Sequence, residues 1–396
     1  MGIDSYNEIS TSETGISRKR IDMKVLLVRT YPDQLDPKRY NIQEIGLASA
    51  LRRAGVLCDI ILFLKSGKDH IEIRRDGTKI YWKRGLNIAK NALFFRLNSI
   101  LDQYDVIQVH EYDQIQSWKI YTKYHKCKVI IYHGPYYSAF NRGYNFKCAV
   151  FDRFFLPRSR QAKERIQCLT KSPLAEQFLR SKGFRHVTAV GVGLNPEPLL
   201  SESPKQSAVN IPKNKINLIY VGKLEERRNT KFLLRLMEEL AHRSSKYHLT
   251  LVGNGSVEYL AELEPELKSL KQQGCITHYN KLSQAELSIL YREADLMLFP
   301  SMYEIYGMVL MEAMYFGVPC ISSWNGGSSL LIENEEDGVI LPRFDVMLWA
   351  DCVERLSNDN DKMRGMKVKA ATKIKERFTW DKLAPKFIEL YSAKNP

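Results

Sequence analysis

The sequence of 396 residues has no long apolar run. No stretch approaches the roughly 20 consecutive apolar residues that a membrane-spanning helix needs. The first 22 residues, MGIDSYNEISTSETGISRKRID, are polar and lack the apolar segment of a secretory signal. We therefore expect a cytoplasmic protein, and we interpret residues 1–22 as a disordered extension.

Cysteine is sparse and scattered. The chain has seven cysteines, an odd number, and no C-x-x-C pair. A disulfide framework or a zinc site needs closer and more regular spacing. We expect all seven to be reduced thiols: Cys58, Cys127, Cys148, Cys168, Cys275, Cys320 and Cys352.

Acidic residues are too few in the first half of the chain to balance the basic ones. Residues 1–200 carry 33 Lys and Arg against 19 Asp and Glu, whereas residues 201–396 carry 26 of each, so the net charge of +14 belongs to the first half. A one-sided positive field favours an anionic partner, although a solvated basic face is the simpler alternative. Residues 141–165 combine basic and aromatic side chains, which favours an anionic membrane surface. We expect no nucleic-acid partner, because no binding motif accompanies the charge.

Short apolar runs alternate with longer amphipathic segments along most of the sequence. This alternation predicts an α/β protein with two doubly wound domains, in which ligands bind at the carboxyl ends of the strands. A stretch rich in Pro, Ser and Lys separates the two series and predicts a linker. We also expect a hairpin at 71–82 and a helix at 89–101. The predicted units are a first domain at 23–197, a linker at 198–214, a second domain at 215–377, and a final segment at 378–396.

The stretch EIYGMVLMEAMYFG, residues 304–317, places two glutamates eight positions apart among apolar residues. We expect Glu304 in the loop after a strand and Glu312 about one turn into a helix at 308–316. A buried carboxylate is costly unless it has a partner. The helix start also offers unpaired amides to an anion, and they belong to Ile305, Tyr306, Gly307 and Met308. This arrangement suits a ligand with hydroxyls at both ends and phosphate between them, such as a sugar nucleotide.

The longer stretch FPSMYEIYGMVLMEAMYFGVPCISSWNGG resembles the signature of the retaining GT-B glycosyltransferases of family 4, the glycosyl transferases group 1. Four further segments resemble the same family: YVGKLEERRN, HLTLVGNG, DVIQVHEYD and VIIYHG. The resemblance implies a GT-B fold, in which two Rossmann-like domains face each other across a cleft. It also implies a retaining glycosyltransferase that needs no metal ion.

The resemblance assigns the donor to the second domain. Glu312 would accept hydrogen bonds from the ribose hydroxyls, and Glu304 would contact the transferred sugar. Lys223 and Arg228 would neutralise the departing diphosphate, where negative charge develops. Arg227 is adjacent to Arg228, so the sequence leaves open which arginine reaches the phosphates. The other donor-side residues we assign are Gly222, Gly253, Asn280, Leu282, Ile305, Tyr306, Gly307 and Met308.

The acceptor side resembles the family less closely. The loop YPDQLDPKRYN, residues 31–41, has no glycine, whereas the family often has two there. His110 is implied as a positioning and electrostatic residue of the catalytic site, beside Glu304, Lys223 and Arg228. We assign the acceptor to Lys38, Arg39, His133, Gly134 and Tyr136. None of the segments that resemble the family contains a metal-binding D-x-D motif, so we expect no metal and no cofactor, with the nucleotide sugar as a co-substrate.

These observations predict a function. The protein would move a sugar from a UDP- or GDP-sugar to a glycan or a polyprenyl-diphosphate-linked acceptor in cell-surface polysaccharide biosynthesis. It would work at the inner face of the cell membrane as a peripheral protein. A non-catalytic subunit that binds sugar nucleotide or lipid remains an alternative, as does a sugar-nucleotide epimerase of the same fold. A phosphorylase is less consistent, because we find no cofactor lysine. The segment 378–391 resembles the family's closing helix, which would act as a hinge between the domains.

Overall fold

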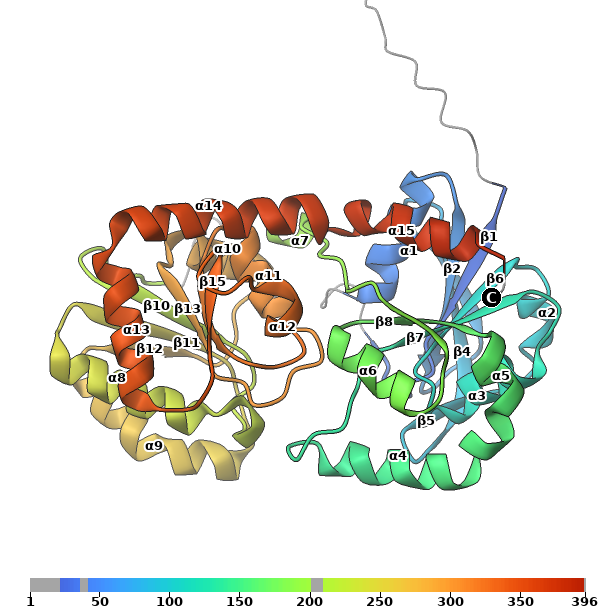
Figure 1. Cartoon of the computed structure of the whole chain (residues 1–396), viewed down its shortest axis with the longest axis horizontal. Coiled ribbons are helices and arrows are strands. Elements are labelled where there is room, and N and C mark those ends of the chain that lie inside the picture. Colours follow the sequence, from blue (N-terminus) through green and yellow to red (C-terminus); the bar gives the residue numbers. More distant parts are fainter. Residues whose placement is uncertain (1–21, 36–41, 201–208, 395–396) are drawn as a thin grey trace, which may run out of the picture.

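The computed structural model describes residues 22–35, 42–200 and 209–394. Figure 1 shows two lobes side by side, each built around a sheet with helices on both faces. In the first lobe the strands follow the order β3-β4-β2-β1-β6-β7-β8-β9, with β5 paired to β4. In the second the order is β12-β11-β10-β13-β14-β15, and every pairing is parallel. The predicted α/β architecture is confirmed.

In the centre of the first sheet, β1 and β6 are mainly apolar and buried on both faces, as helix-covered parallel strands usually are. The strands are β1 Lys24–Val28, β2 Leu57–Leu64, β3 His70–Ile73, β4 Lys79–Ile88, β5 Asn91–Phe94, β6 Val106–His110, β7 Lys128–His133, β8 Gln167–Thr170 and β9 His186–Ala189. The helices are α1 Gln43–Arg53, α2 Asn98–Leu101, α3 Ile115–Lys123, α4 Arg142–Phe154, the 3-10 helix η1 Leu156–Ser159, α5 Arg160–Arg165, α6 Pro173–Ser181 and α7 Glu197–Leu200.

The second sheet begins at Ile216, after the chain leaves the first sheet at Ala189. Its strands are β10 Ile216–Val221, β11 Tyr247–Val252, β12 Ile276–Tyr279, β13 Leu296–Phe299, β14 Cys320–Ser323 and β15 Gly338–Leu341. The helices are the 3-10 helix η2 Glu226–Arg228, α8 Thr230–Arg243, α9 Val257–Gln272, α10 Gln284–Glu293, α11 Met308–Tyr315, α12 Ser328–Leu331, α13 Val346–Asn358, α14 Asn360–Arg377 and α15 Trp380–Ser392. Helix α10 starts at a capping box formed by Ser283 and Glu286.

The helix predicted at 89–101 is wrong. Strand β4 continues to Ile88 and the chain reverses through Ala89 and Lys90, whose φ angles of 49° and 60° form a tight turn. Residues Asn91–Phe94 then pair with β4 as the antiparallel strand β5, and only the short helix α2 follows. The Asn91 side chain donates to the carbonyls of Ile88 and Ala89, at 3.2 and 2.9 Å. Pairing with the free edge of β4 therefore makes this segment a strand, although its apolar residues have helical spacing.

The last helix, α15, crosses back to the first domain. Figure 1 shows α14 along the second lobe and α15 over the first, beside α1. Trp380, at the start of α15, is buried against α1 and the segment after β9: a Cβ added at Gly46 or Gly193 would lie 2.3 or 2.4 Å from its ring. The hydroxyl of Tyr391 donates to Oε1 of Gln108 in β6, at 2.8 Å. The chain thus completes the core of its first domain with its last helix.

Candidate functional site

The carboxyl ends of the two sheets meet at the interface between the domains. The hydroxyl of Tyr136, after β7, donates a hydrogen bond to the carbonyl of Glu304 (2.9 Å) and accepts one from the N–H of Gly326 (3.0 Å). The hydroxyl of Tyr306 donates to the carbonyl of Val192, after β9, at 2.7 Å. Residues of the first domain therefore hold the loop of the second domain that carries Glu304. Tyr136, which we assigned to the acceptor, has its hydroxyl on this donor-side loop.

The carboxylate of Glu304 pairs with the guanidinium of Arg228. Arg228 lies in η2 after β10, and its Nη1 also donates to Oγ of Ser301 at 3.1 Å. Its neighbour Arg227 pairs with Glu225, with Nε 2.7 Å from the carboxylate. The structure therefore brings Arg228, the residue we assigned first, to Glu304.

The start of α11 presents backbone N–H groups beside Glu304. Gly307 precedes the helix with a φ of 83°, a left-handed conformation that glycine adopts without strain. The N–H groups of Tyr306, Gly307 and Met308 donate to no acceptor in the described part of the chain. The N–H of Ile305 instead donates to Oε1 of Glu304 at 3.1 Å. Three of the four amides expected for an anion are thus unengaged.

Glu312 lies one turn into α11 and is 5 % exposed. The hydroxyl of Tyr291, in α10, donates to its Oε2 at 3.0 Å. Burial raises the pKa of Glu312 to about 7, although the hydrogen bond from Tyr291 acts in the opposite direction. This carboxyl group therefore changes its charge close to neutral pH.

Lys223 lies in the loop after β10 and is exposed. Two glycines allow the loop after β11 to lie directly against this loop. A Cβ at Gly253 would lie 1.8 Å from the carbonyl oxygen of Gly222, and one at Gly255 would lie 2.3 Å from that of Leu224. The close approach fixes the backbone on both sides of Lys223 at the carboxyl edge of the sheet.

The segment after β12 contributes two of the predicted donor residues. Asn280 is exposed, whereas the side chain of Leu282 is 8 % exposed and belongs to the core that includes Leu310 and Met311 of α11. The side chain of Leu282 is therefore part of the core and does not lie on the surface of the site.

His110 ends β6 beside a carboxylate that sequence analysis missed. Its Nδ1 lies 3.1 Å from Oε1 of Glu44 in α1, and the same oxygen accepts from Nη1 of Arg29 at 2.9 Å. Burial alone would raise the pKa of Glu44, but the charges of Arg29 and His110 hold that pKa well below its usual range. Nε2 of His110 is buried and has no hydrogen-bond partner among the described residues. The available signal was a glutamate on the apolar face of the helix predicted around residues 42–55.

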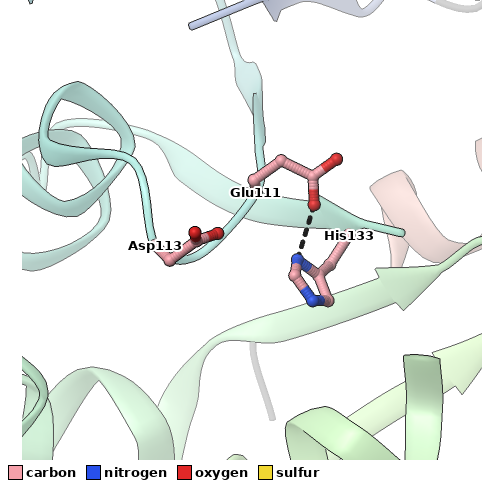
Figure 2. Close-up of side chains that lie close together, drawn as sticks. All are labelled: Glu111, Asp113 and His133. Carbon is pink, nitrogen blue, oxygen red and sulfur yellow. Dashed lines mark ion pairs between the residues drawn. The ribbon is translucent and has the colours of Figure 1, made fainter. Parts of the chain in front are cut away.

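A second buried pair joins the ends of β6 and β7 (Figure 2). Oε2 of Glu111 lies 2.6 Å from Nδ1 of His133 and accepts from the N–H of Gly134 at 2.9 Å. Nζ of Lys171 lies 3.6 Å from the other oxygen. Burial alone would raise the pKa of Glu111, but the charges of His133 and Lys171 lower it to about 2. The His133 ring stacks on Phe178 at 5.5 Å. Glu111 therefore contacts both His133 and Gly134.

Asp113 approaches the same pair (Figure 2). One oxygen of Asp113, one oxygen of Glu111 and one nitrogen of His133 lie within 4.8 Å of one another. Carboxylates and imidazole are common metal ligands, but two lysines already neutralise these carboxylates. Lys147 lies 3.4 Å from Asp113, and Lys171 lies 3.6 Å from Glu111. The donor set therefore fits a polar cluster with its own counter-charges better than a metal centre.

Two of the residues assigned to the acceptor, Lys38 and Arg39, lie outside the described residues. The described start of their loop includes Tyr31. Burial raises the pKa of the Tyr31 hydroxyl well above its usual value, and the charges of Glu111 and Asp113 act in the same direction. This side of the interface is thus lined by aromatic and acidic groups of the first domain.

The second half of the chain matches a known protein family. Residues 202–373 match the family described as glycosyl transferases group 1. This match covers most of the second domain and includes Lys223, Arg228, Glu304 and Glu312. The resemblance on which the donor-side assignments were based is therefore confirmed for the second domain.

Curated relatives of this part of the chain include two proteins named D-inositol 3-phosphate glycosyltransferase. The protein from Corynebacterium diphtheriae is 28 % identical over 217 residues, which cover 52 % of this chain and 50 % of that protein. The protein from Arthrobacter sp. is 26 % identical over 190 residues, covering 48 % of this chain and 45 % of that protein. The chain spans about half the length of the curated relatives it matches.

Solved structures of glycosyltransferases share the fold over almost the whole chain. Sucrose-phosphate synthase from Thermosynechococcus elongatus superposes with a TM-score of 0.70 at 19 % identity, covering 93 % of this chain and 98 % of that one. HepE of Anabaena in complex with UDP-glucose superposes with a TM-score of 0.65 at 16 % identity, covering 93 % and 99 %. The predicted GT-B fold is confirmed for both domains.

Proposed function

We propose that the protein is a glycosyltransferase that uses a nucleotide sugar held mainly by its second domain. The observation that carries the proposal is the pairing of Arg228 with Glu304 beside the open amides of α11. It places a cation, a carboxylate and a helix N-terminus together at the carboxyl ends of β10 and β13, where ligands of such sheets bind. A UDP-sugar is the favoured donor, because the HepE neighbour was solved with UDP-glucose.

Each group has a role that follows from its chemistry. Lys223, Arg228 and the N–H groups at the start of α11 would bind the diphosphate, where charge accumulates as the sugar leaves. When phosphate enters, Arg228 would exchange Glu304 for the phosphate oxygens, which frees that carboxylate to accept hydrogen bonds from the sugar. Glu312 would accept hydrogen bonds from the ribose hydroxyls, and these favour its charged form.

We further infer that the reaction retains configuration and needs no divalent metal. Two cations and a helix terminus supply the positive charge that a metal ion would otherwise provide. His110 would orient the transferred sugar through its unpartnered Nε2, while Glu44 fixes the ring through Nδ1. Activity that persists in excess chelator, with an unchanged anomeric configuration in the product, is the expected result.

The acceptor we propose is a glycan or a polyprenyl-diphosphate-linked sugar of cell-surface polysaccharide assembly at the inner face of the membrane. The support is the positive charge of the first half of the chain, which suits a diphosphate and an anionic surface. None of the described helices is long and apolar enough to cross a membrane, so contact with the bilayer would be peripheral.

A panel of nucleotide sugars tests the donor. A ligand at 100 times its dissociation constant stabilises the folded state by about 2.7 kcal/mol, so the true donor raises the melting temperature. The wild-type protein should then hydrolyse that donor slowly, and Glu304→Ala should lose at least about 100-fold in rate. Glu264→Ala, on the exposed face of α9, is the matched control and should behave as wild type.

The same experiment separates the alternatives. Binding without hydrolysis or transfer would favour a non-catalytic subunit, and conversion of the donor to its epimer would favour an epimerase. If no nucleotide sugar changed the melting temperature, the proposal would fail.

A further inference from the structure

Helix α4 exposes an apolar stripe. Phe146, Val150 and Phe154 occupy successive positions four residues apart and are 74, 42 and 57 % exposed. The opposite face of the helix is buried through Cys148 and Phe151. A helix of a globular domain usually buries its apolar face. A second apolar face that is exposed to water therefore indicates a surface that a membrane or another molecule covers. We call these three residues the α4 stripe.

Basic side chains flank the α4 stripe. Arg142 and Arg153 lie on the same helical face, are exposed, and form no ion pair within the described residues. Residues 137–165 contain seven Lys and Arg against two acidic residues. Such a combination of exposed aromatic rings and unpaired cations complements the headgroup region of an anionic bilayer.

A basic pocket follows directly after the C-terminal end of α4. The cavity, about 600 Å³ in volume, is lined by one carboxylate, Glu164, and by four cations: Arg160, Lys163, Arg180 and Arg185. Arg185 pairs with Glu164 at 2.6 Å and Arg180 with Glu176 at 2.8 Å, whereas Arg160 and Lys163 form no ion pair with any described residue. The pocket therefore carries an excess of positive charge and has the size and the donors to take a phosphate group.

We propose that the α4 stripe and the basic pocket form one docking surface for an anionic bilayer. Phe146, Val150 and Phe154 lie at the boundary between headgroups and acyl chains, Arg142 and Arg153 face lipid phosphates, and the pocket takes the phosphate of one headgroup. A protein partner fits less well, because charged residues are depleted in the cores of protein interfaces.

The position of α4 relates the docking surface to the candidate site. Tyr136, which contacts the Glu304 loop, precedes α4 by a short segment, and Figure 1 places α4 at the edge of the first lobe opposite α14 and α15. Docking through α4 brings the acceptor side of the site toward the membrane while the connecting helices stay in water. This use rests on the proposed function, but the binding itself does not.

Vesicle flotation tests the surface. We expect wild-type protein to bind vesicles of equal parts phosphatidylglycerol and phosphatidylcholine, to bind phosphatidylcholine alone weakly, and to dissociate as salt is raised. The double variant Phe146→Glu/Phe154→Glu should bind the anionic vesicles at least about tenfold more weakly. Arg160→Glu should weaken binding by about fivefold or more, as expected for one cation near an anionic surface.

Matched controls lie in the second domain. Val368→Glu changes an apolar residue that is 62 % exposed, and Arg235→Glu changes an exposed arginine of α8. Both should bind vesicles as wild type does. Three results would each overturn the proposal: equal binding to neutral vesicles, undiminished binding of the stripe variant, or equal losses in the controls. So would tight binding to heparin without binding to vesicles, since that result indicates a surface for soluble polyanions.

Donor binding, measured on the same preparations, separates this proposal from the proposed function. The stripe variant should keep the nucleotide-sugar shift in melting temperature. Vesicle binding without any nucleotide-sugar shift would remove the proposed function and leave the docking surface. A nucleotide-sugar shift without vesicle binding would remove the docking surface and leave the proposed function.

Discussion

The carboxyl group of Glu312 keeps its proton to a higher pH in the folded protein than in the unfolded chain. Burial raises its pKa from 4.5 to about 7 in the folded protein. Between these two values the folded state binds more protons than the unfolded state, so stability falls as pH rises. The contribution of Glu312 is fully present below about pH 4.5 and is lost as pH rises through about 7.

Glu312→Gln should remove this dependence. The difference between the two pKa values corresponds to about 3 kcal/mol, which the variant should gain in free energy of unfolding at about pH 8 relative to wild type. At about pH 4 the two proteins should be nearly equally stable. Urea unfolding across this range measures the difference, and identical pH slopes in the two proteins would contradict it. The same variant should bind nucleotide more weakly, because a neutral amide accepts hydrogen bonds from ribose less strongly.

Arg227 and Arg228 have the same charge but different partners. Arg228 pairs with Glu304, whereas Arg227 pairs with Glu225. We expect Arg228→Ala to reduce kcat/KM for the donor by about 100-fold, the usual cost of removing one group that stabilises transition-state charge. Arg227→Ala, the matched control, should stay within about threefold of wild type. Steady-state kinetics of donor hydrolysis distinguish them, and a larger loss in Arg227→Ala would reverse the assignment.

Among the elements, the loop after β7 and the loop after β13 depend on each other. The Tyr136 hydroxyl is the link, because it both donates to the carbonyl of Glu304 and accepts from the N–H of Gly326. A Cβ at Gly326 would lie 2.5 Å from the carbonyl oxygen of Glu304, so the loops after β13 and β14 lie too close for a larger residue at position 326. The position of Glu304 is therefore set partly by the other domain.

Tyr136→Phe should weaken this link without removing the ring. The variant removes the hydroxyl that contacts the carbonyl of Glu304 and the N–H of Gly326, and these two groups keep their own hydrogen bond of 3.1 Å. The loss is therefore that of an ordinary hydrogen bond, about 1 kcal/mol. We expect kcat for transfer to fall by about tenfold, while the affinity for nucleotide alone changes by less than about twofold. Single-turnover kinetics and nucleotide titration measure the two quantities. An equal loss in both would mean that Tyr136 supports the donor site itself and not the approach of the domains.

For the whole molecule, α15 joins the end of the chain to its beginning. Trp380 and Tyr391 are each 2 % exposed, and Nζ of Lys128 donates to the carbonyl of Leu390 at 2.8 Å. The core of the first domain is therefore complete only when α15 packs against it. This arrangement couples the stability of the first domain to a helix that follows the second.

Trp380→Ala should lower the free energy of unfolding of the first domain by about 3–5 kcal/mol, the usual cost of removing a large buried aromatic side chain. Trp380→Phe should lose less. Trp324→Ala, at a position that is 60 % exposed, is the control and should be nearly neutral. Urea unfolding followed by hydrogen exchange assigns the loss to a domain. A loss confined to the second domain would contradict the coupling.

The sequence predicted structural features that depend on neighbouring residues, and it missed features that depend on residues far apart in the chain. The strand, turn and helix around Glu304 and Glu312 are contiguous, so apolar spacing and a glycine were sufficient to place them. The hairpin of β4 and β5 was misread, because pairing with an existing edge outweighs the helical spacing of residues 89–101. Glu44 was missed, since nothing local indicates that a helix glutamate meets His110 66 residues later.

The sequence by itself determined the fold and the local elements around Glu304 and Glu312. Alternating apolar segments specify parallel sheets, and short-range motifs specify loop and helix start, because both depend on the periodicity of nearby residues. Only the tertiary structure decided that Arg228 meets Glu304 across 76 residues and that Tyr136 meets the same residue across 168. Such contacts depend on how the sheets are stacked and how the domains meet, and no local pattern encodes that geometry.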